Sequence, residues 1–462
     1  YVYHTLNTRI IMFESLTRRS YLTGSVLGAL TVVSSFSIGA AGFNTDTTLS
    51  AENWPGFRYD SDGTGVARGI SLSEQPKSSW SRSENEVSTG GLSKRISAPV
   101  RANRIVCYTT KDTVVARGSA NGEQLWTADK PESADPMVTP AVADGRLITG
   151  DGTVTAWDLT TGSEIWNVKL SGSGVSAPIT IHDNTVYIGT SSGLSGAILA
   201  LDFETGERLW KNSTGGRITD SITIRGDSVY VADDAGGLRQ IIDGEAMWNR
   251  QFDGQSFQGS IIGDSAIVLL WYGLPDEYAD NPSGIITTVD RSNGEEIDQE
   301  DGLVKIDFAP IYLDGDLIVV NSNGQIKRQP ISGGFDEWEQ SVEAISGAPI
   351  LVDDTIVIGL ESGDVIGIDP GSGEVRWQES VLDEPIGGLC AGQNAVYVTG
   401  KYTSIGGLHY EPSLTARGDV QRLIQSLITA NSYGITESTA TQELIAASEA
   451  LLDQNYAVAS EA

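Results

Sequence analysis

Short apolar runs alternate with turn residues through the central part of the chain. In the clearest stretch, Ser176–Ile181, Thr185–Thr190 and Ala197–Leu201 are apolar or β-branched, and Asp183-Asn184 separates the first two runs. Runs of this length between Asp, Asn and Gly residues are typical of buried strands, and the Asx-rich pair favours a hairpin turn with positive φ. The same turn recurs elsewhere as Asp144-Gly145 and Asp353-Asp354.

A second turn follows each group of strands and has the form Asp-x-x-x-Gly, with a tryptophan four residues after the glycine. Asp158, Gly162 and Trp166 form one copy, and Asp202 and Gly206 begin another. We expect the aspartate to accept hydrogen bonds from its own backbone while the glycine adopts the left-handed conformation. Both turns are therefore interpreted as structural, with metal binding as the less favoured alternative.

The tryptophans recur at a near-constant step of 38 to 49 residues, if Ile297 is taken to fill one missing slot. They are Trp80, Trp126, Trp166, Trp210, Trp248, Trp338 and Trp377. A period near forty residues made of short strands predicts an all-β, eight-bladed β-propeller with four-stranded antiparallel blades. Seven blades is the alternative if one repeat is degenerate.

The two ends of the repeat array indicate how the ring closes. The slot at Trp80 precedes any complete blade, and the last strands, from Ile386 to about Tyr410, lack a following tryptophan. An N-terminal strand is therefore predicted to complete the last blade, which would leave no open sheet edge.

The repeat resembles the pyrroloquinoline-quinone (PQQ) repeat, on the pattern Ala156, Asp158, Gly162, Trp166. That repeat occurs in quinoprotein dehydrogenases and in non-enzymatic relatives such as the outer-membrane assembly lipoprotein BamB. The stretch Trp54–Gly65 also resembles the Trp-Pro-x-Phe-Arg-x-Asp opening of secreted members. The resemblance covers roughly residues 54 to 411 and implies that each tryptophan packs between neighbouring blades.

Charge narrows the setting in which the protein works. There are 61 acidic and 30 basic residues, a net charge of −31, and only nine lysines. Such a surface is self-repelling in dilute buffer and is tolerated where salt screens charges over a few ångströms. The composition resembles that of salt-in halophilic archaea; an acidic patch for a basic partner is the alternative. Nucleic-acid binding is disfavoured because no basic stripe exists to neutralise phosphates.

The first 41 residues resemble a twin-arginine export signal. Arg18 and Arg19 precede an apolar stretch, 22–41, that ends in small residues. Cleavage near Gly42 is favoured over a retained membrane anchor, although about 20 residues are enough to span a bilayer. We therefore expect an extracellular or cell-surface protein with no transmembrane segment once the signal is removed.

An enzymatic role is the alternative to a binding role. The resemblance implies that a quinoprotein dehydrogenase would use PQQ and Ca²⁺, yet no adjacent cysteine pair or recognisable calcium ligand set is present. His182 and His409 stand alone and are interpreted as structural. Cys107 and Cys390 fall in the first and last blades, where two buried thiols are favoured over a disulfide. No catalytic, cofactor-binding or metal-binding residue is assigned.

One irregular stretch in the fifth blade interrupts the repeat and is the candidate partner loop. It carries aromatic and acidic residues: Trp271, Tyr272, Asp276, Glu277 and Tyr278. Exposed aromatics of this kind anchor protein contacts. An ordinary surface loop is the equal alternative, and a calcium site using Asp276, Glu277 and Asp280 is a weaker one.

Beyond the repeats the pattern changes to helical spacing. Val420, Leu423, Ile424, Leu427 and Ile428 share one helix face, and a second helix is expected through Leu444, Leu451 and Leu452. Such a hairpin cannot bury its apolar face alone, so it packs on the propeller, self-associates or docks on a partner. The expected organisation is a signal segment 1–41, a lead-in or linker 42–76, the propeller 77–411 and a helical segment 412–462. The expected function is an exported, non-catalytic scaffold for an unknown protein partner.

Overall fold

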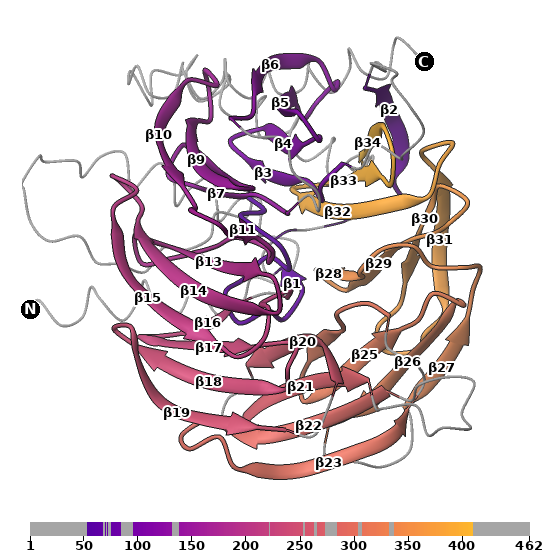
Figure 1. Cartoon of the computed structure of the whole chain (residues 1–462). Coiled ribbons are helices and arrows are strands. Elements are labelled where there is room, and N and C mark those ends of the chain that lie inside the picture. Colours follow the sequence, from indigo (N-terminus) through magenta and orange to yellow (C-terminus); the bar gives the residue numbers. More distant parts are fainter. Residues whose placement is uncertain are drawn as a thin grey trace, which may run out of the picture. The chain divides into compact units, whose positions relative to one another are not determined.

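The chain folds into eight antiparallel β-sheets that succeed one another along the sequence, each of which is one blade of a β-propeller (Figure 1). The computed structural model describes residues 53–409 except 68–69, 71, 73–74, 85–95, 132–137, 221, 253–254, 263–265, 273–283, 304–306 and 332–336. All of them belong to one compact unit, Leu49–Ala462. Within the described residues there is no helix, and so none long and apolar enough to span a bilayer.

Blades one to four follow the predicted repeat. Blade one is β3 (Val100–Ala102), β4 (Ile105–Thr109), β5 (Thr113–Gly118) and β6 (Gln124–Asp129). Blade two is β7 (Ala141–Ala143), β8 (Arg146–Gly150), β9 (Thr153–Asp158) and β10 (Glu164–Lys169). Blade three is β11 (Gly174–Val175), β12 (Thr180–His182), β13 (Thr185–Ser192), β14 (Ser195–Asp202) and β15 (Arg208–Thr214). Blade four is β16 (Thr223–Arg225), β17 (Ser228–Ala232), β18 (Gly237–Ile242) and β19 (Glu245–Gln251).

Blades five to eight complete the ring. Blade five is β20 (Gln255–Ile262), β21 (Ala266–Tyr272), β22 (Gly284–Asp290) and β23 (Glu296–Leu303). Blade six is β24 (Ile311–Leu313), β25 (Asp316–Val320), β26 (Gln325–Pro330) and β27 (Trp338–Ser341). Blade seven is β28 (Ile350–Val352), β29 (Thr355–Gly359), β30 (Asp364–Ile368) and β31 (Val375–Ser380), extended by β1 (Val66–Ala67). Blade eight is β32 (Ile386–Gly392), β33 (Ala395–Gly400), β34 (Ser404–His409) and β2 (Lys77–Ser83).

The N-terminal strand β2 closes the ring, as the two ends of the repeat array predicted. It pairs antiparallel with β34, from Lys77 opposite His409 to Ser83 opposite Ser404, and the two strands lie side by side in Figure 1. Both the eight-blade count and this closure are confirmed. Because β2 comes from the start of the chain, it completes the last blade to four strands and joins the two ends of the array.

The hydrophobic core lies between blades rather than inside any one of them. Each apolar cluster joins consecutive blades: Ile148 and Leu199 connect blades two and three, and Val320 and Ile356 connect six and seven. One larger cluster includes Val106, Val357 and Val396 and so joins blades one, seven and eight across the closure. Every blade thus buries its faces against its two neighbours, which explains why the strands read as near-continuous apolar runs.

The two turn types adopt the predicted conformations. Asp183 and Asn184 have φ of 45° and 58° in the hairpin between β12 and β13. In the second turn, the Oδ1 of Asp158 accepts hydrogen bonds from the backbone N–H of Thr160 at 3.0 Å and of Thr161 at 2.8 Å. Gly162 closes that turn with φ of 72°. Both turns are confirmed as local backbone structures.

Candidate interaction surfaces and the ring axis

The repeated tryptophans occupy equivalent places on the outermost strands, and each lies between its own blade and the next. Six of them lie against the turn glycine of the following blade, in the pairs Trp80–Gly122, Trp126–Gly162, Trp166–Gly206, Trp210–Gly244, Trp248–Gly294 and Trp338–Gly373. Four of the indole N–H groups, those of Trp80, Trp126, Trp166 and Trp338, donate to a carbonyl of the following blade; Trp126 donates to that of Leu159 at 2.8 Å. Trp377 is buried in the cluster that joins blades seven, eight and one.

The missing tryptophan slot in blade five belongs to Asp298, not to Ile297. In blade three Trp210 pairs with Ala200 and Leu209 bulges out of register, and in blade five Asp298 pairs with Thr288 while Ile297 takes the bulge. Ile297 is 58 % exposed, like the bulge residue Leu209 at 54 %. The sequence assignment was one residue off because an apolar side chain was expected at a position that this blade fills with an exposed carboxylate.

The lead-in, residues 53–67, lies against the first strands of five blades and is not a separate linker. Its carbonyls and amides bond in turn to β3, β7, β16, β24 and β28, through Arg101, Val142, Ile224, Tyr312 and Leu351. The distances are 2.6 to 3.0 Å. It ends as β1, parallel to β28. The first strands of several neighbouring blades contact one another, among them β3 with β7, β16 with β20 and β32 with β3. The lead-in therefore lies on the inner, axis-facing side of these first strands.

Arg58 is the buried charge at the centre of the lead-in, with 4 % of its surface exposed. Its Nε donates to the carbonyl of Gly63 at 2.7 Å, and its Nη2 donates to the carbonyl of Pro310 in the segment before β24. Burial lowers the pKa of the guanidinium to about 10, and the negative charges of Asp220 and Asp60 oppose that shift. The group stays protonated at neutral pH and ties the lead-in to blade six.

Two aspartates of the lead-in already have partners. Asp60 accepts from the backbone N–H of Thr64 at 2.9 Å and from its hydroxyl. Burial raises the pKa of Asp60 to about 6, against the effect of those hydrogen bonds. Asp62 pairs with Arg225 of β16 at 2.8 Å. These carboxylates hold the lead-in in place on the ring.

The charged side chains of the lead-in do not by themselves form a site for a calcium-bound quinone. Asp60 and Asp62 are engaged by Thr64 and Arg225, and the buried cation of Arg58 lies beside them. Across the part of the chain that the structure describes, no three His, Cys, Asp or Glu side chains gather where they could hold a metal ion. The donor set that the chemistry needs, acidic and amide oxygens free to coordinate, is not found among these groups.

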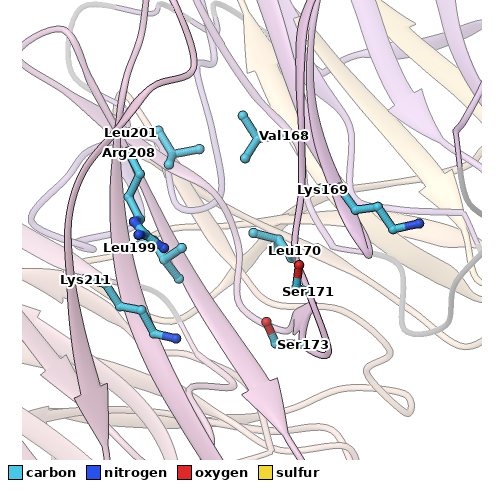
Figure 2. A pocket seen from close by; sticks show the side chains of 9 residues that line it. All are labelled: Val168, Lys169, Leu170, Ser171, Ser173, Leu199, Leu201, Arg208 and Lys211. Atoms are coloured by element: carbon cyan, nitrogen blue, oxygen red, sulfur yellow. The ribbon is translucent and has the colours of Figure 1, made fainter.

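A cleft of about 470 Å³ opens between blades two and three (Figure 2). Its lining combines four apolar side chains, two serines and three basic residues: Val168, Leu170, Leu199, Leu201, Ser171, Ser173, Lys169, Arg208 and Lys211. None of the lining residues is acidic. Sequence reasoning missed this cleft because its residues come from separate strands and form no motif along the chain.

The predicted partner loop is only partly described. Trp271 and Tyr272 are the last residues of β21, paired with Ile285 and Gly284 of β22, so they belong to the sheet and not to the loop. Asp276, Glu277, Tyr278 and Asp280 lie outside the described residues, as do Arg18, Arg19 and the C-terminal segment 412–462.

Within the described residues, the cysteines and His409 lie at the ring closure, and His182 lies in a hairpin. Cys107 on β4 and Cys390 on β32 are free, buried thiols in adjoining blades, and burial raises the pKa of both. The Nε2 of His409 lies 3.1 Å from the carbonyl of Ser119 in blade one, and burial lowers its pKa. His182 is 3.3 Å from Asp183, within the same hairpin.

These features define an eight-bladed propeller whose inter-blade tryptophans and Asp-x-x-x-Gly turns are those of the PQQ-like repeat. The family described as "Outer membrane protein assembly factor BamB" matches residues 150–379 and 301–400, which together cover more than half of the 462 residues. The chain belongs to that family.

Individual relatives and solved structures are similar to this chain at low identity. The BamB of Burkholderia pseudomallei is 24 % identical over 329 residues, spanning 63 % of this chain and 81 % of the relative. The crystal structure of BamB from Moraxella catarrhalis matches with a TM-score of 0.56 at 16 % identity, over 73 % of this chain and 98 % of that one. The quinohemoprotein alcohol dehydrogenase of Comamonas testosteroni matches with a TM-score of 0.61 at 14 % identity, over 78 % and 80 %. Likeness at this level to both kinds of structure shows the fold alone.

Proposed function

We propose that this protein is an exported, non-catalytic propeller that holds a protein partner at the cell surface. The observation that carries the proposal is the lead-in, which bonds to the first strands of five blades and brings the buried Arg58 to the region of the axis. Because the lead-in occupies the region of the axis, a protein partner would bind on the outer faces of the ring or in the clefts between blades. The relatives are named as assembly factors for outer membrane proteins, which places their action on other proteins.

The proposed location of the protein and the salt concentration in which it works rest on the N-terminal export signal and on the composition of the chain. Arg18 and Arg19 support export by the twin-arginine route, and the net charge of −31 supports work in concentrated salt. Partner contacts through Asp276, Glu277 and Tyr278, and self-association through 412–462, belong to the same proposal. An outer-membrane role is not carried over, because an archaeal halophile would have no such membrane.

The alternative is a quinoprotein-type dehydrogenase that uses PQQ and Ca²⁺, and one experiment separates the two. The full-length gene, with an affinity tag at its 3′ end, is expressed in its native cells, which are crosslinked before lysis. The proposal expects the protein in the envelope or medium, joined reproducibly to one discrete partner protein. Recovery of the protein alone, together with quinone-dependent oxidation of an alcohol or sugar, would support the dehydrogenase instead.

A further inference from the structure

The cleft between blades two and three is an exception to the charge of the whole chain. Acidic residues outnumber basic ones two to one, 61 to 30, yet this lining contains three cations and no acid. Two of them, Arg208 and Lys211, are exposed on β15 and form no ion pair or side-chain hydrogen bond with any other described residue. Figure 2 shows both on one side of the cleft, while Lys169 points away from them.

The floor of the cleft is apolar and belongs to the packed interface of two blades. Leu170, Leu199 and Leu201 are buried to 8 %, 6 % and 0 % exposure, and Val168 packs against the same cluster. The floor is therefore rigid, because it is the core between β10 and β14. Ser171 and Ser173 lie across from the cations (Figure 2) and offer hydroxyl donors and acceptors. A ligand here meets an apolar floor with positive charge along one rim.

This combination selects among classes of ligand. Nucleic acid and anionic membranes present extended negative charge, and the net charge of −31 on the whole chain would oppose their binding beyond the cleft. A short acidic protein segment needs only local charge, and an apolar side chain on it would fill the floor. The volume, about 470 Å³, accommodates a few side chains and no globular surface.

We propose that the cleft between β10 and β15 docks an extended acidic segment of a partner protein, with an apolar side chain of that segment on Leu170 and Leu199 and its carboxylates on Arg208 and Lys211. The inference rests on the proposed scaffold function and names the surface and the chemistry of the partner that it recruits. Electrostatic complementarity at the rim supplies specificity and speeds association, while the apolar anchor supplies affinity.

The test uses the full chain and two fluorescein-labelled peptides of about 12 residues, in which a central Leu-Leu or Ser-Ser pair is flanked by one Glu on each side and otherwise by Gly and Ser. Anisotropy is measured at the lowest salt in which circular dichroism shows the native fold. The Arg208→Glu/Lys211→Glu variant is compared with Lys111→Glu/Arg250→Glu, which makes the same charge change on blades one and four. Peptide binding by the two double variants is compared only if both retain the native circular dichroism spectrum.

The proposal expects the Leu-Leu peptide to bind and the Ser-Ser peptide to bind at least about tenfold more weakly, because an apolar anchor is lost. Charge reversal in the cleft should weaken binding by about tenfold or more, and the control pair by no more than about twofold. Equal weakening by both variants, or no saturation by about 1 mM peptide, overturns the assignment.

The crosslinking experiment keeps this failure separate from failure of the scaffold proposal. The Arg208→Glu/Lys211→Glu protein is expected to lose the partner that the native protein captures. Retention of that partner leaves the scaffold function standing and overturns the cleft as its docking site. Absence of any partner on the native protein overturns both.

Discussion

The guanidinium of Arg225, on the first strand of blade four, lies 2.8 Å from the carboxylate of Asp62 in the lead-in, 163 positions earlier in the chain. This ion pair is one of several bonds that fix residues 53–67 against the inner ends of the blades. A segment that precedes the repeats is thus part of the propeller. It lines the axis, where quinoprotein relatives of this fold would need space for their cofactor.

Replacing Arg58 by methionine tests whether the lead-in contributes to the stability of the ring. The substitution keeps an apolar stem and removes the donors to the carbonyls of Gly63 and Pro310, which stay buried without their partner. We expect a loss of about 2–4 kcal/mol in the free energy of unfolding, measured by urea denaturation. Arg225→Met is the control: its ion pair is partly exposed and should contribute less than about 1 kcal/mol. Equal losses would mean that burial of Arg58 is unimportant.

Asp60 predicts a specific pH dependence of stability. Burial raises the pKa of this carboxyl to about 6 in the folded state, whereas in the unfolded chain it is near 4. Between about pH 4 and pH 6 the folded state therefore binds more protons than the unfolded state. Stability from this group is therefore present at acid pH and is lost as pH rises through about 6, by up to about 3 kcal/mol. The Asp60→Asn variant should lack this pH dependence. As the pH rises from 4.5 to 7.5, its free energy of unfolding should therefore approach or exceed that of the native protein. A difference between the two proteins that is constant with pH would contradict the assignment.

Alanine substitutions at Gly162 and Gly172 distinguish the cost of backbone strain from the cost of disturbing a tryptophan contact. Both have φ near 72° to 75°, but a Cβ on Gly162 would lie 2.6 Å from the Trp126 ring, whereas a Cβ on Gly172 has no atom within 4 Å. Gly172→Ala should destabilise by about 1 kcal/mol through the left-handed conformation alone. Gly162→Ala should cost at least about 2 kcal/mol more in thermal unfolding, because the ring must move. Similar losses for the two variants would argue against tight packing between blades one and two.

The thiols of Cys107 and Cys390 should be unreactive in the native protein. Both are buried and their pKa values are raised, so little thiolate is present to attack a disulfide reagent. We expect no reaction with Ellman's reagent at pH 8 in the folded state and two equivalents after denaturation without reductant. If the denatured protein titrates only after reduction, the two cysteines are joined in a disulfide.

The blades could be predicted from the sequence because the turns and strand ends of each repeat are determined by residues close together in the chain. The turn at Asp158 and the positive φ of Asp183-Asn184 depend on side chains within a few residues, and a tryptophan equivalent to Trp166 marks the outermost strand in seven of the eight blades. The closure through β2 followed from the count of strands at the two ends. Local chemistry that recurs from blade to blade is a strong signal even in a single sequence.

The features that escaped prediction depend on contacts between distant segments. The lead-in bonds to five blades mainly through backbone groups, and the motif in Trp54–Gly65 does not reveal which strands those groups contact. The cleft cations Arg208 and Lys211 form a candidate binding site only together with Leu170 of the preceding blade. The register of blade five was misread because Asp298, not an apolar residue, pairs with Thr288. Each of these requires the three-dimensional neighbour as well as the sequence.

The most direct test of the account is calorimetric titration of PQQ with Ca²⁺ into the full chain, held in molar salt and shown to be folded by circular dichroism. A non-catalytic propeller, with Arg58 and the lead-in beside its axis, predicts no saturable heat with PQQ. Saturable binding near one equivalent, lost when Ca²⁺ is chelated, would contradict that claim and assign the chain to the quinoprotein enzymes.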